Sequence, residues 1–192
     1  MMIRQLLPGD DLKTAARLIY DTDSKGFARM FGPREKAVSS IEKLIQLDSN
    51  HFSHRFIWVW CDDAVRALMI VFTREEMRHS LKSTDYLACF SPVELAALAF
   101  RQARYRVPVS YKNEEAYIQN ICVAPQDRNR GIGSEMLNHC FERLKSMGKT
   151  TVSLDVGTTN QGARRLYEKL GFQTVGNKKR NAHSVHMRKQ LA

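Results

Sequence analysis

The sequence lacks an apolar run long enough to cross a membrane, because none approaches the roughly 18 residues that a spanning helix needs. The N-terminal stretch also lacks the apolar region and small-residue cleavage site of a signal peptide, so the expected location is the cytoplasm. There are only four cysteines, widely spaced and without a Cys-x-x-Cys pair. Their distribution predicts reduced, packed thiols and excludes a dense disulfide framework.

Metal-ligand patterns are scarce as well. His51 and His54 stand three residues apart, as do His183 and His186, but neither pair has a second ligand pair nearby. Structural metal sites require three or four ligands, so no metal is predicted. Internal repeats and low-complexity tracts are also missing, which leaves one domain spanning residues 1–192 as the expected organisation.

What is present is a chain with enough apolar residues for a core and with an uneven charge. Hydrophobic residues make up 43% of the sequence and the formal net charge is +10. From Ile121 onward, 13 Lys and Arg stand against 5 Asp and Glu. A basic half attracts a ligand with several phosphates, or nucleic acid. No nucleic-acid-binding motif accompanies Lys178-Lys179-Arg180, so a solvated turn is the simpler interpretation of that triplet.

An apolar strand, a basic glycine turn and an amphipathic helix follow one another in this basic half. Tyr117 to Val123 is rich in β-branched and aromatic residues, which predicts a strand that ends before Pro125. Gly131 and Gly133 would bring the main chain close to a ligand at a helix start, where free amides and the helix dipole favour an anion. Apolar residues recur at steps of three and four up to Gly148, which predicts the helix end: Ile132, Met136, Leu137, Cys140, Phe141, Leu144 and Met147.

Two common phosphate-binding motifs do not fit this turn. A P-loop requires Lys-Ser or Lys-Thr after the second glycine, but Gly133 is followed by Ser134 and Glu135. A dinucleotide fingerprint requires a third glycine where Met136 stands, and a strand that ends in an acidic residue for the ribose, which we do not find.

The turn resembles the acetyl-CoA signature of the GNAT superfamily of N-acetyltransferases, Gln/Arg-x-x-Gly-x-Gly/Ala, which matches Arg128-Asn129-Arg130-Gly131-Ile132-Gly133. A second stretch, from Asn160 to Phe172, is similar to the family's next helix in its asparagine start, its alanine, its tyrosine and its terminal Gly-Phe. Independently of the family, Asn160 suits an N-cap and Gly171 suits a left-handed helix end. The two motifs stand in the family's order, joined by a predicted strand at Thr151 to Val156.

The resemblance implies a fold, a cosubstrate and a set of site residues. The fold would be α/β, with a mixed central β-sheet flanked by helices, and acetyl-CoA would bind where the strands starting at Tyr117 and Thr151 splay apart. Main-chain groups of the first strand would pair with the pantetheine arm, and amides of the turn would hold the diphosphate. The implied cofactor-binding residues are Ile121, Cys122, Val123, Arg128, Asn129, Arg130, Gly131, Ile132, Gly133, Ser134, Asn160 and Tyr167. Tyr167 would also act as general acid and protonate the departing thiolate.

The general base stays unassigned. The attacking amine must be neutral, so a base or a water chain must take its proton. The family often supplies a carboxylate on the strand that here reads Tyr117 to Val123, and this stretch has none. Glu114, Glu115 and Asp155 stand nearby, and nothing in the sequence selects among them.

Simpler interpretations of two residues stay open. Tyr167 shares a helical face with Ala163, Leu166 and Leu170, so it also suits a core aromatic. An acetylated Cys122 nucleophile is disfavoured, because this cysteine stands in an apolar strand without a histidine partner. The predicted function is direct transfer of the acetyl group of acetyl-CoA to a primary amine of a small molecule, peptide or protein. The alternatives are a catalytically silent acyl-CoA-binding or regulatory domain and a basic nucleic-acid-binding module.

The other elements follow from periodicity. Further strands are expected at 3–7, 56–61, 65–72, 172–178 and 184–189, and further helices at 11–21 and 34–47, with Thr22 to Pro33 as a link. Residues 74–114 are expected to form a helical insertion between the third and fourth strands, in which Ser91-Pro92-Val93-Glu94 is a capping box. Beside the sheet, this insertion would shape an acceptor pocket, contact a second copy of the chain in a homodimer, or simply add packing.

Overall fold

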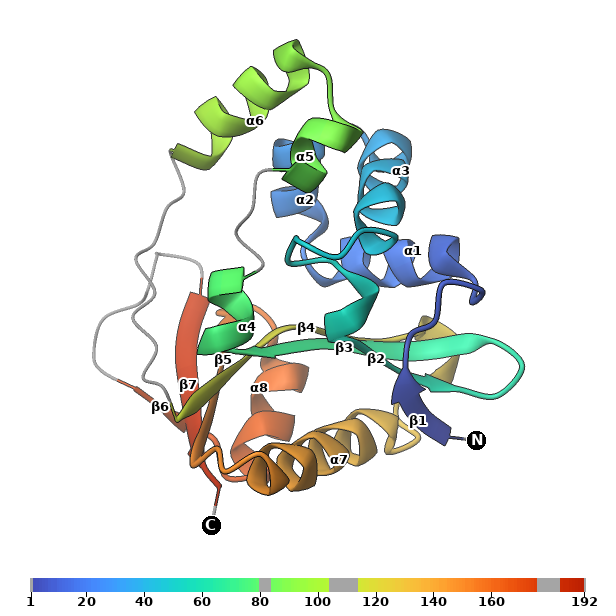
Figure 1. Ribbon diagram of the computed structural model, residues 1–192. Helices are drawn as coiled ribbons and strands as arrows, with labels where there is room; N and C mark the ends of the chain where they lie inside the picture. The colour runs from blue at the N-terminus through green and yellow to red at the C-terminus, as the bar shows by residue number, and fades with distance from the viewer. Residues whose placement is uncertain (1, 80–83, 104–113, 176–183, 192) are drawn as a thin grey trace.

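The structure, a computed structural model, describes residues 2–79, 84–103, 114–175 and 184–191. Its centre is a seven-stranded sheet in the order β1-β2-β3-β4-β5-β7-β6, with helices on both faces (Figure 1). Neighbouring strands are antiparallel except β4 and β5, which are parallel. The strands are β1 (Met2–Gln5), β2 (Ile57–Cys61), β3 (Val65–Thr73), β4 (Glu115–Val123), β5 (Thr151–Gly157), β6 (Gln173–Thr174) and β7 (Ser184–Gln190). This arrangement confirms the predicted mixed α/β fold.

Three N-terminal helices cover one face of the sheet: α1 (Leu12–Thr22), α2 (Ser24–Phe31) and α3 (Arg34–Ile45). The prediction that Thr22 to Pro33 is a link without a helix is wrong, because α2 lies within this stretch. Asp23 accepts a hydrogen bond from the Gly26 amide at 2.9 Å and so starts a new helix directly after α1. Phe27 and Phe31, one helical turn apart, are both buried and anchor it.

Two helices cover the other face: α7 (Ile132–Ser146) and α8 (Gln161–Lys169). Gly131 and Gly148 flank α7 with φ angles of 84° and 68°, as the glycine positions predict. Six of the seven apolar residues predicted to face inward are buried, but Met147 is 41% exposed because the helix ends at Ser146. No helix within the described ranges is both long and apolar enough to span a bilayer.

The insertion after β3 is helical, as predicted, but most of it does not lie beside the sheet. Its described residues form α4 (Arg74–His79), α5 (Thr84–Cys89) and α6 (Pro92–Ala103). Only α4 packs against β3 and β4, whereas α5 and α6 rest on α2 and α3, farther from the sheet (Figure 1). Glu94 caps α6 through the Ser91 amide at 3.0 Å and pairs with Lys36 of α3 at 2.6 Å. The aromatic rings of Phe31 and Phe90 stack at 5.9 Å in the same contact.

Element boundaries differ from the predictions by a few residues. β1 ends at Gln5, Phe56 belongs to a short 3₁₀ helix, η1 (His54–Phe56), and a second one, η2 (Pro125–Asp127), follows β4. β4 begins at Glu115, two residues earlier than predicted, so the conclusion that this strand carries no carboxylate is wrong. Lys178-Lys179-Arg180 and His183 lie outside the described residues.

Candidate active site

The two parallel strands at the centre of the sheet part from each other half-way along. Their pairing ends at Ile118 of β4 and Leu154 of β5. Both strands continue beyond that pair, β4 to Val123 and β5 to Gly157. Gln119 is an extra residue of β4 opposite β3, and a bulge of this kind bends its strand. The strands therefore separate beyond Ile118 and Leu154, and the last residues of β4 border the opening.

Beyond β4, consecutive main-chain amides are left without partners. Within the described part of the chain, the amides of residues 129–134 make no hydrogen bond. Asn129 and Gly131 both have left-handed backbones, with φ angles of 61° and 84°, which turn the chain sharply into α7. This helix begins at Ile132 without a side-chain cap, so its amides and the positive end of its dipole are open to an anion.

The arginines of this turn are oriented by the protein. Nη1 of Arg130 donates to Oδ1 of the buried Asp127 at 2.7 Å, and Nε of Arg128 donates to the Val123 carbonyl at 3.1 Å. Arg66 of β3, which the sequence argument did not name, lies 3.5 Å from the other oxygen of Asp127. One buried carboxylate therefore holds two guanidinium groups beside the open amides.

Of the two glycines of the turn, only Gly131 has a backbone that favours glycine. At Gly131 a Cβ would meet nothing within 4 Å, so the left-handed backbone is the reason for glycine there. At Gly133 a Cβ would lie 3.4 Å from Cδ2 of Leu166 and 3.8 Å from Cγ2 of Val123. These are ordinary van der Waals distances, so Gly133 lies against α8 and β4 without a steric need for glycine.

Helix α8 positions Asn160 and Tyr167. The Oδ1 atom of Asn160 accepts a hydrogen bond from the Ala163 amide at 3.1 Å, which confirms the predicted N-cap. Tyr167 is 6% exposed, and its ring lies 5.7 Å from that of Phe172. Burial raises the pKa of Tyr167 to about 12, with a smaller contribution from the Cys122 thiol. The phenol is therefore protonated at neutral pH, and its hydroxyl makes no hydrogen bond with the described residues.

The three β4 residues predicted to bind the cosubstrate lie beside the opening. Ile121 and Val123 pack toward α7 and α8, whereas Cys122 belongs to the core on the α1 side. Burial raises the pKa of the Cys122 thiol, which opposes formation of a thiolate. This burial agrees with the interpretation of Cys122 as a packed residue.

Three polar side chains from three strands meet on the α1 side of the sheet, next to the opening. The hydroxyl of Tyr117 on β4 donates to Oδ2 of Asp155 on β5 at 3.0 Å. The other oxygen, Oδ1, lies 2.9 Å from Nδ1 of His186, the residue directly opposite on β7. Leu154 and Val156, the neighbours of Asp155, are in the core with α7 and α8, so the carboxylate faces the other way.

The structure distinguishes the three carboxylates that the sequence left equivalent. Glu115 is 1% exposed and receives Nε of Arg188 at 3.0 Å, so it belongs to a buried ion pair. Glu114 is exposed at the end of the sheet where β4 and β5 are still paired. Asp155 lies beyond the last β4–β5 pair, with 21% of its side chain exposed. It is the one of the three that borders the opening.

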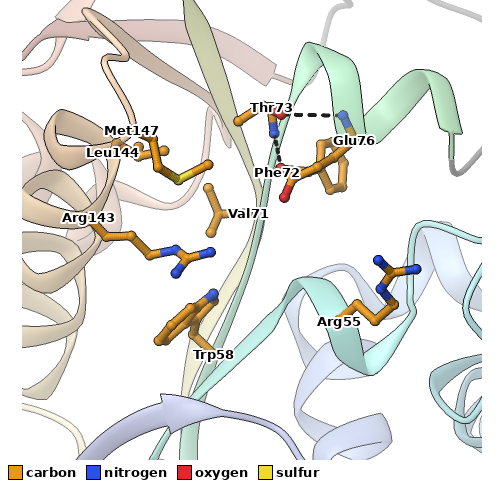
Figure 2. A pocket seen from close by; sticks show the side chains of 9 residues that line it. All are labelled: Arg55, Trp58, Val71, Phe72, Thr73, Glu76, Arg143, Leu144 and Met147. Carbon is orange, nitrogen blue, oxygen red and sulfur yellow. Dashed lines mark hydrogen bonds between the residues drawn. The ribbon is translucent and has the colours of Figure 1, made fainter.

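A small hollow at the far end of α7 is not part of this site. Figure 2 shows it between Trp58, Arg143 and Met147, with Thr73 and Glu76 hydrogen-bonded to each other at its rim. Its volume is about 10 Å³, room for one water molecule at most. It adjoins the C-terminal end of α7, a helix of 15 residues, so the glycine turn at the other end lies roughly 20 Å away.

Comparison with known proteins agrees with this geometry. The model of the acetyltransferase (GNAT) family matches residues 27–172, which is most of the chain. The chain belongs to the GNAT family. Members of this family use acetyl-CoA as acetyl donor. The unbonded amides of residues 129–134, the left-handed Gly131 and the separation of β4 from β5 fit such a ligand.

Curated relatives of this GNAT protein match shorter stretches. An uncharacterised N-acetyltransferase of Methanocaldococcus jannaschii is 44% identical over 62 residues, which are 32% of this chain and 27% of that protein. The [ribosomal protein bS18]-alanine N-acetyltransferase of Salmonella typhimurium is 41% identical over 59 residues, 31% of this chain and 40% of the relative. N-alpha-acetyltransferase 50 of Danio rerio is 33% identical over 95 residues, 48% of this chain and 53% of that protein. The matched stretches thus span between about a quarter and a half of these relatives.

Solved structures share the fold over the whole chain. An N-acetyltransferase from Staphylococcus aureus has a TM-score of 0.76 at 24% identity, covering 98% of this chain and 100% of that one. An N-acetyltransferase from Thermoplasma acidophilum, solved in complex with coenzyme A, has a TM-score of 0.58 at 13% identity, with 98% of both chains covered.

Sequence reasoning missed Tyr117 and His186 as neighbours of Asp155. One signal was present, because Asp155 stands between Leu154 and Val156 and an alternating strand must turn it away from their face. The partner on β7 depends on the β5–β7 register, which no local pattern specifies.

Proposed function

We propose that this GNAT protein transfers the acetyl group of acetyl-CoA directly to a primary amine. The proposal is supported by three groups near the point where β4 and β5 separate. The amides of residues 129–134 make no hydrogen bond within the described part of the chain, the protonated Tyr167 lies on the α8 side of the sheet, and Asp155 lies on the opposite face beyond the last β4–β5 pair. An anion cradle, a proton donor and a carboxylate are the groups that such a transfer requires.

In this proposal the turn and β4 bind acetyl-CoA, which supplies an activated acyl group as a thioester. The amides of residues 129–134 hold the diphosphate, and Arg66, Arg128 and Arg130 add positive charge beside it. The main chain of residues 121–123, which lies beyond the last pair with β5, hydrogen-bonds the pantetheine arm. Asn160 orders the adjoining loop by capping α8.

The chemical step moves two protons. The neutral acceptor amine attacks the carbonyl carbon, and Asp155 takes one proton from its nitrogen as the carbon–nitrogen bond forms and the carbon–sulfur bond breaks. Tyr167 gives its hydroxyl proton to the departing sulfur. Solvent returns a proton to Tyr167 and removes one from Asp155, so the protein ends in its starting state.

The acceptor we propose is an amine of a peptide or protein. Support comes from two relatives whose names specify such acceptors, the alanine of ribosomal protein bS18 and the N-alpha position. The matched stretches include only part of each relative, so the acceptor is tested directly: thiol release from acetyl-CoA is followed with a panel of N-terminal peptides, lysine peptides, polyamines and aminoglycosides. Transfer to a small amine alone would contradict the peptide acceptor and leave the acetyltransferase proposal standing.

Cosubstrate binding is tested separately by thermal unfolding. Acetyl-CoA at about 100 times its Kd should stabilise the folded protein by roughly 2.7 kcal/mol and raise Tm by about 5–10 °C. An unchanged Tm at millimolar acetyl-CoA would contradict binding itself. A raised Tm without thiol release from any amine would instead support an acyl-CoA-binding domain without catalysis.

A further inference from the structure

The carboxylate proposed as the base is held from two sides, and we infer that His186 is a positioning residue for Asp155. This inference rests on the proposed function, because it assigns His186 a role through the base of that reaction. The imidazole lies on the side of Asp155 away from the opening, on β7, so it would act on the acceptor nitrogen only through the carboxylate.

The geometry fixes both oxygens of the carboxylate. Asp155 and His186 are directly opposite each other in the antiparallel β5–β7 pair, and their Oδ1 and Nδ1 atoms are 2.9 Å apart. On the other side, the Tyr117 hydroxyl reaches Oδ2 at 3.0 Å from β4. These two contacts come from strands on either side of β5 and restrict the rotation of the carboxylate about its last bond. Removal of the His186 contact would therefore loosen the orientation of Asp155.

The His186 imidazole is placed to donate a hydrogen bond to Asp155 rather than to accept one. Nδ1 faces a carboxylate, which has only lone pairs to offer when ionised, so in the neutral imidazole the proton belongs on Nδ1. His186 is 13% exposed and Asp155 is 21% exposed, so little solvent competes with this hydrogen bond. The pair therefore resembles the carboxylate–imidazole pairs in which one partner orients the other.

A purely structural role for His186 can be separated from positioning, because the same strand offers a matched pair. Arg188, two residues along β7, donates to the buried Glu115 of β4 at 3.0 Å. That pair lies where β4 and β5 are still joined, away from the opening. Breaking it should lower stability without a specific effect on the chemical step.

The experiment compares His186→Ala, His186→Asn and Arg188→Gln in the full chain, with kcat, acetyl-CoA affinity and Tm measured for each. His186→Ala should lower kcat by roughly 10- to 100-fold, because a misplaced catalytic group costs about that much, while acetyl-CoA affinity stays within about twofold. His186→Asn should recover most of kcat, since an amide nitrogen replaces the Nδ1 donor. Arg188→Gln should lower Tm with a much smaller change in kcat.

A double-mutant cycle with Asp155→Asn then tests whether His186 acts through Asp155. In the Asp155→Asn background, His186→Ala should have no further effect on kcat. A wild-type kcat in His186→Ala, or an equal loss from that change in both backgrounds, would overturn the positioning role while leaving the proposed function intact. If the wild-type protein transfers acetyl to no amine, or if Asp155→Asn keeps wild-type kcat, the proposed function or its base fails first and the inference fails with it.

Discussion

Tyr167 presents the sharpest single-residue question, because a buried aromatic on α8 suits both core packing and proton donation. We predict that Tyr167→Phe lowers kcat by roughly 100-fold or more, the usual contribution of a general acid, and leaves acetyl-CoA affinity unchanged. The ring and its contact with Phe172 are kept, so packing is preserved and only the proton is lost. Steady-state kinetics and a thermal shift with acetyl-CoA measure the two quantities.

Tyr86 in α5 provides the matched control. Burial raises the pKa of Tyr86 to about 12, as it does for Tyr167, but Tyr86 stacks on Phe90 in the insertion. Tyr86→Phe should therefore keep wild-type kcat. If the two variants have equal kcat, Tyr167 is a core aromatic and the acid is another group or solvent.

Asp155 shows what single residues reveal before the fold is known. The sequence shows that Asp155 is a carboxylate in an alternating strand, and this is enough to name it as a candidate base. The contacts that distinguish it from Glu115 join residues that are far apart in the sequence: Asp155 with Tyr117 and His186, and Glu115 with Arg188. Such contacts depend on strand register, which is set by the folded sheet.

At the scale of elements, the glycine turn and α7 form a unit whose two ends can be compared. Gly131 and Gly148 flank the same helix, both have left-handed backbones, and a Cβ at either would meet nothing within 4 Å. Aspartate at both positions costs similar backbone strain, about 1–2 kcal/mol. The helix dipole favours a carboxylate at position 131 and disfavours it at 148, so stability alone predicts the larger loss for Gly148→Asp.

Acetyl-CoA affinity should follow the opposite order. Gly131→Asp places a negative charge beside the proposed diphosphate site, and we predict that it weakens acetyl-CoA binding by roughly tenfold or more, about 1.4 kcal/mol. Gly148→Asp should bind acetyl-CoA as the wild type does. Isothermal titration of both variants measures this difference, and equal affinities would show that the turn does not hold the diphosphate.

The elements that the sequence predicts well are those with strong local signals. α7 and α8 have apolar periodicity, an N-terminal turn or cap and a terminal glycine, and their boundaries are close to the prediction. α2 was missed because its eight residues contain Gly26 and adjoin Gly32 and Pro33, which indicate a loop. The bulge at Gln119 was also missed, since an extra residue in a strand has no signature until its partner strand is known.

At the scale of the whole molecule, the buried Tyr167 phenol and Cys140 thiol make the free energy of unfolding fall as the pH becomes alkaline. Burial raises the pKa of Tyr167 from 10.0 to about 12 and that of the Cys140 thiol from 9.0 to about 12. Both groups hold their protons more tightly in the folded chain than in the unfolded chain. Their contribution to stability is therefore complete below about pH 9 and is lost as the pH rises toward 12.

Urea unfolding from pH 8 to pH 11 measures this loss, and Tyr167→Phe isolates one share of it. Without an ionisable phenol, the variant should lose less stability than the wild type between pH 9 and pH 11, by on the order of 1 kcal/mol at pH 11. Other alkaline titrations act on both proteins equally, so they cancel in the difference. If the two stability curves run parallel, the Tyr167 phenol reaches solvent in the folded state and has its ordinary pKa. Tyr167 would then lose its proton near pH 10, and kcat would fall above that pH.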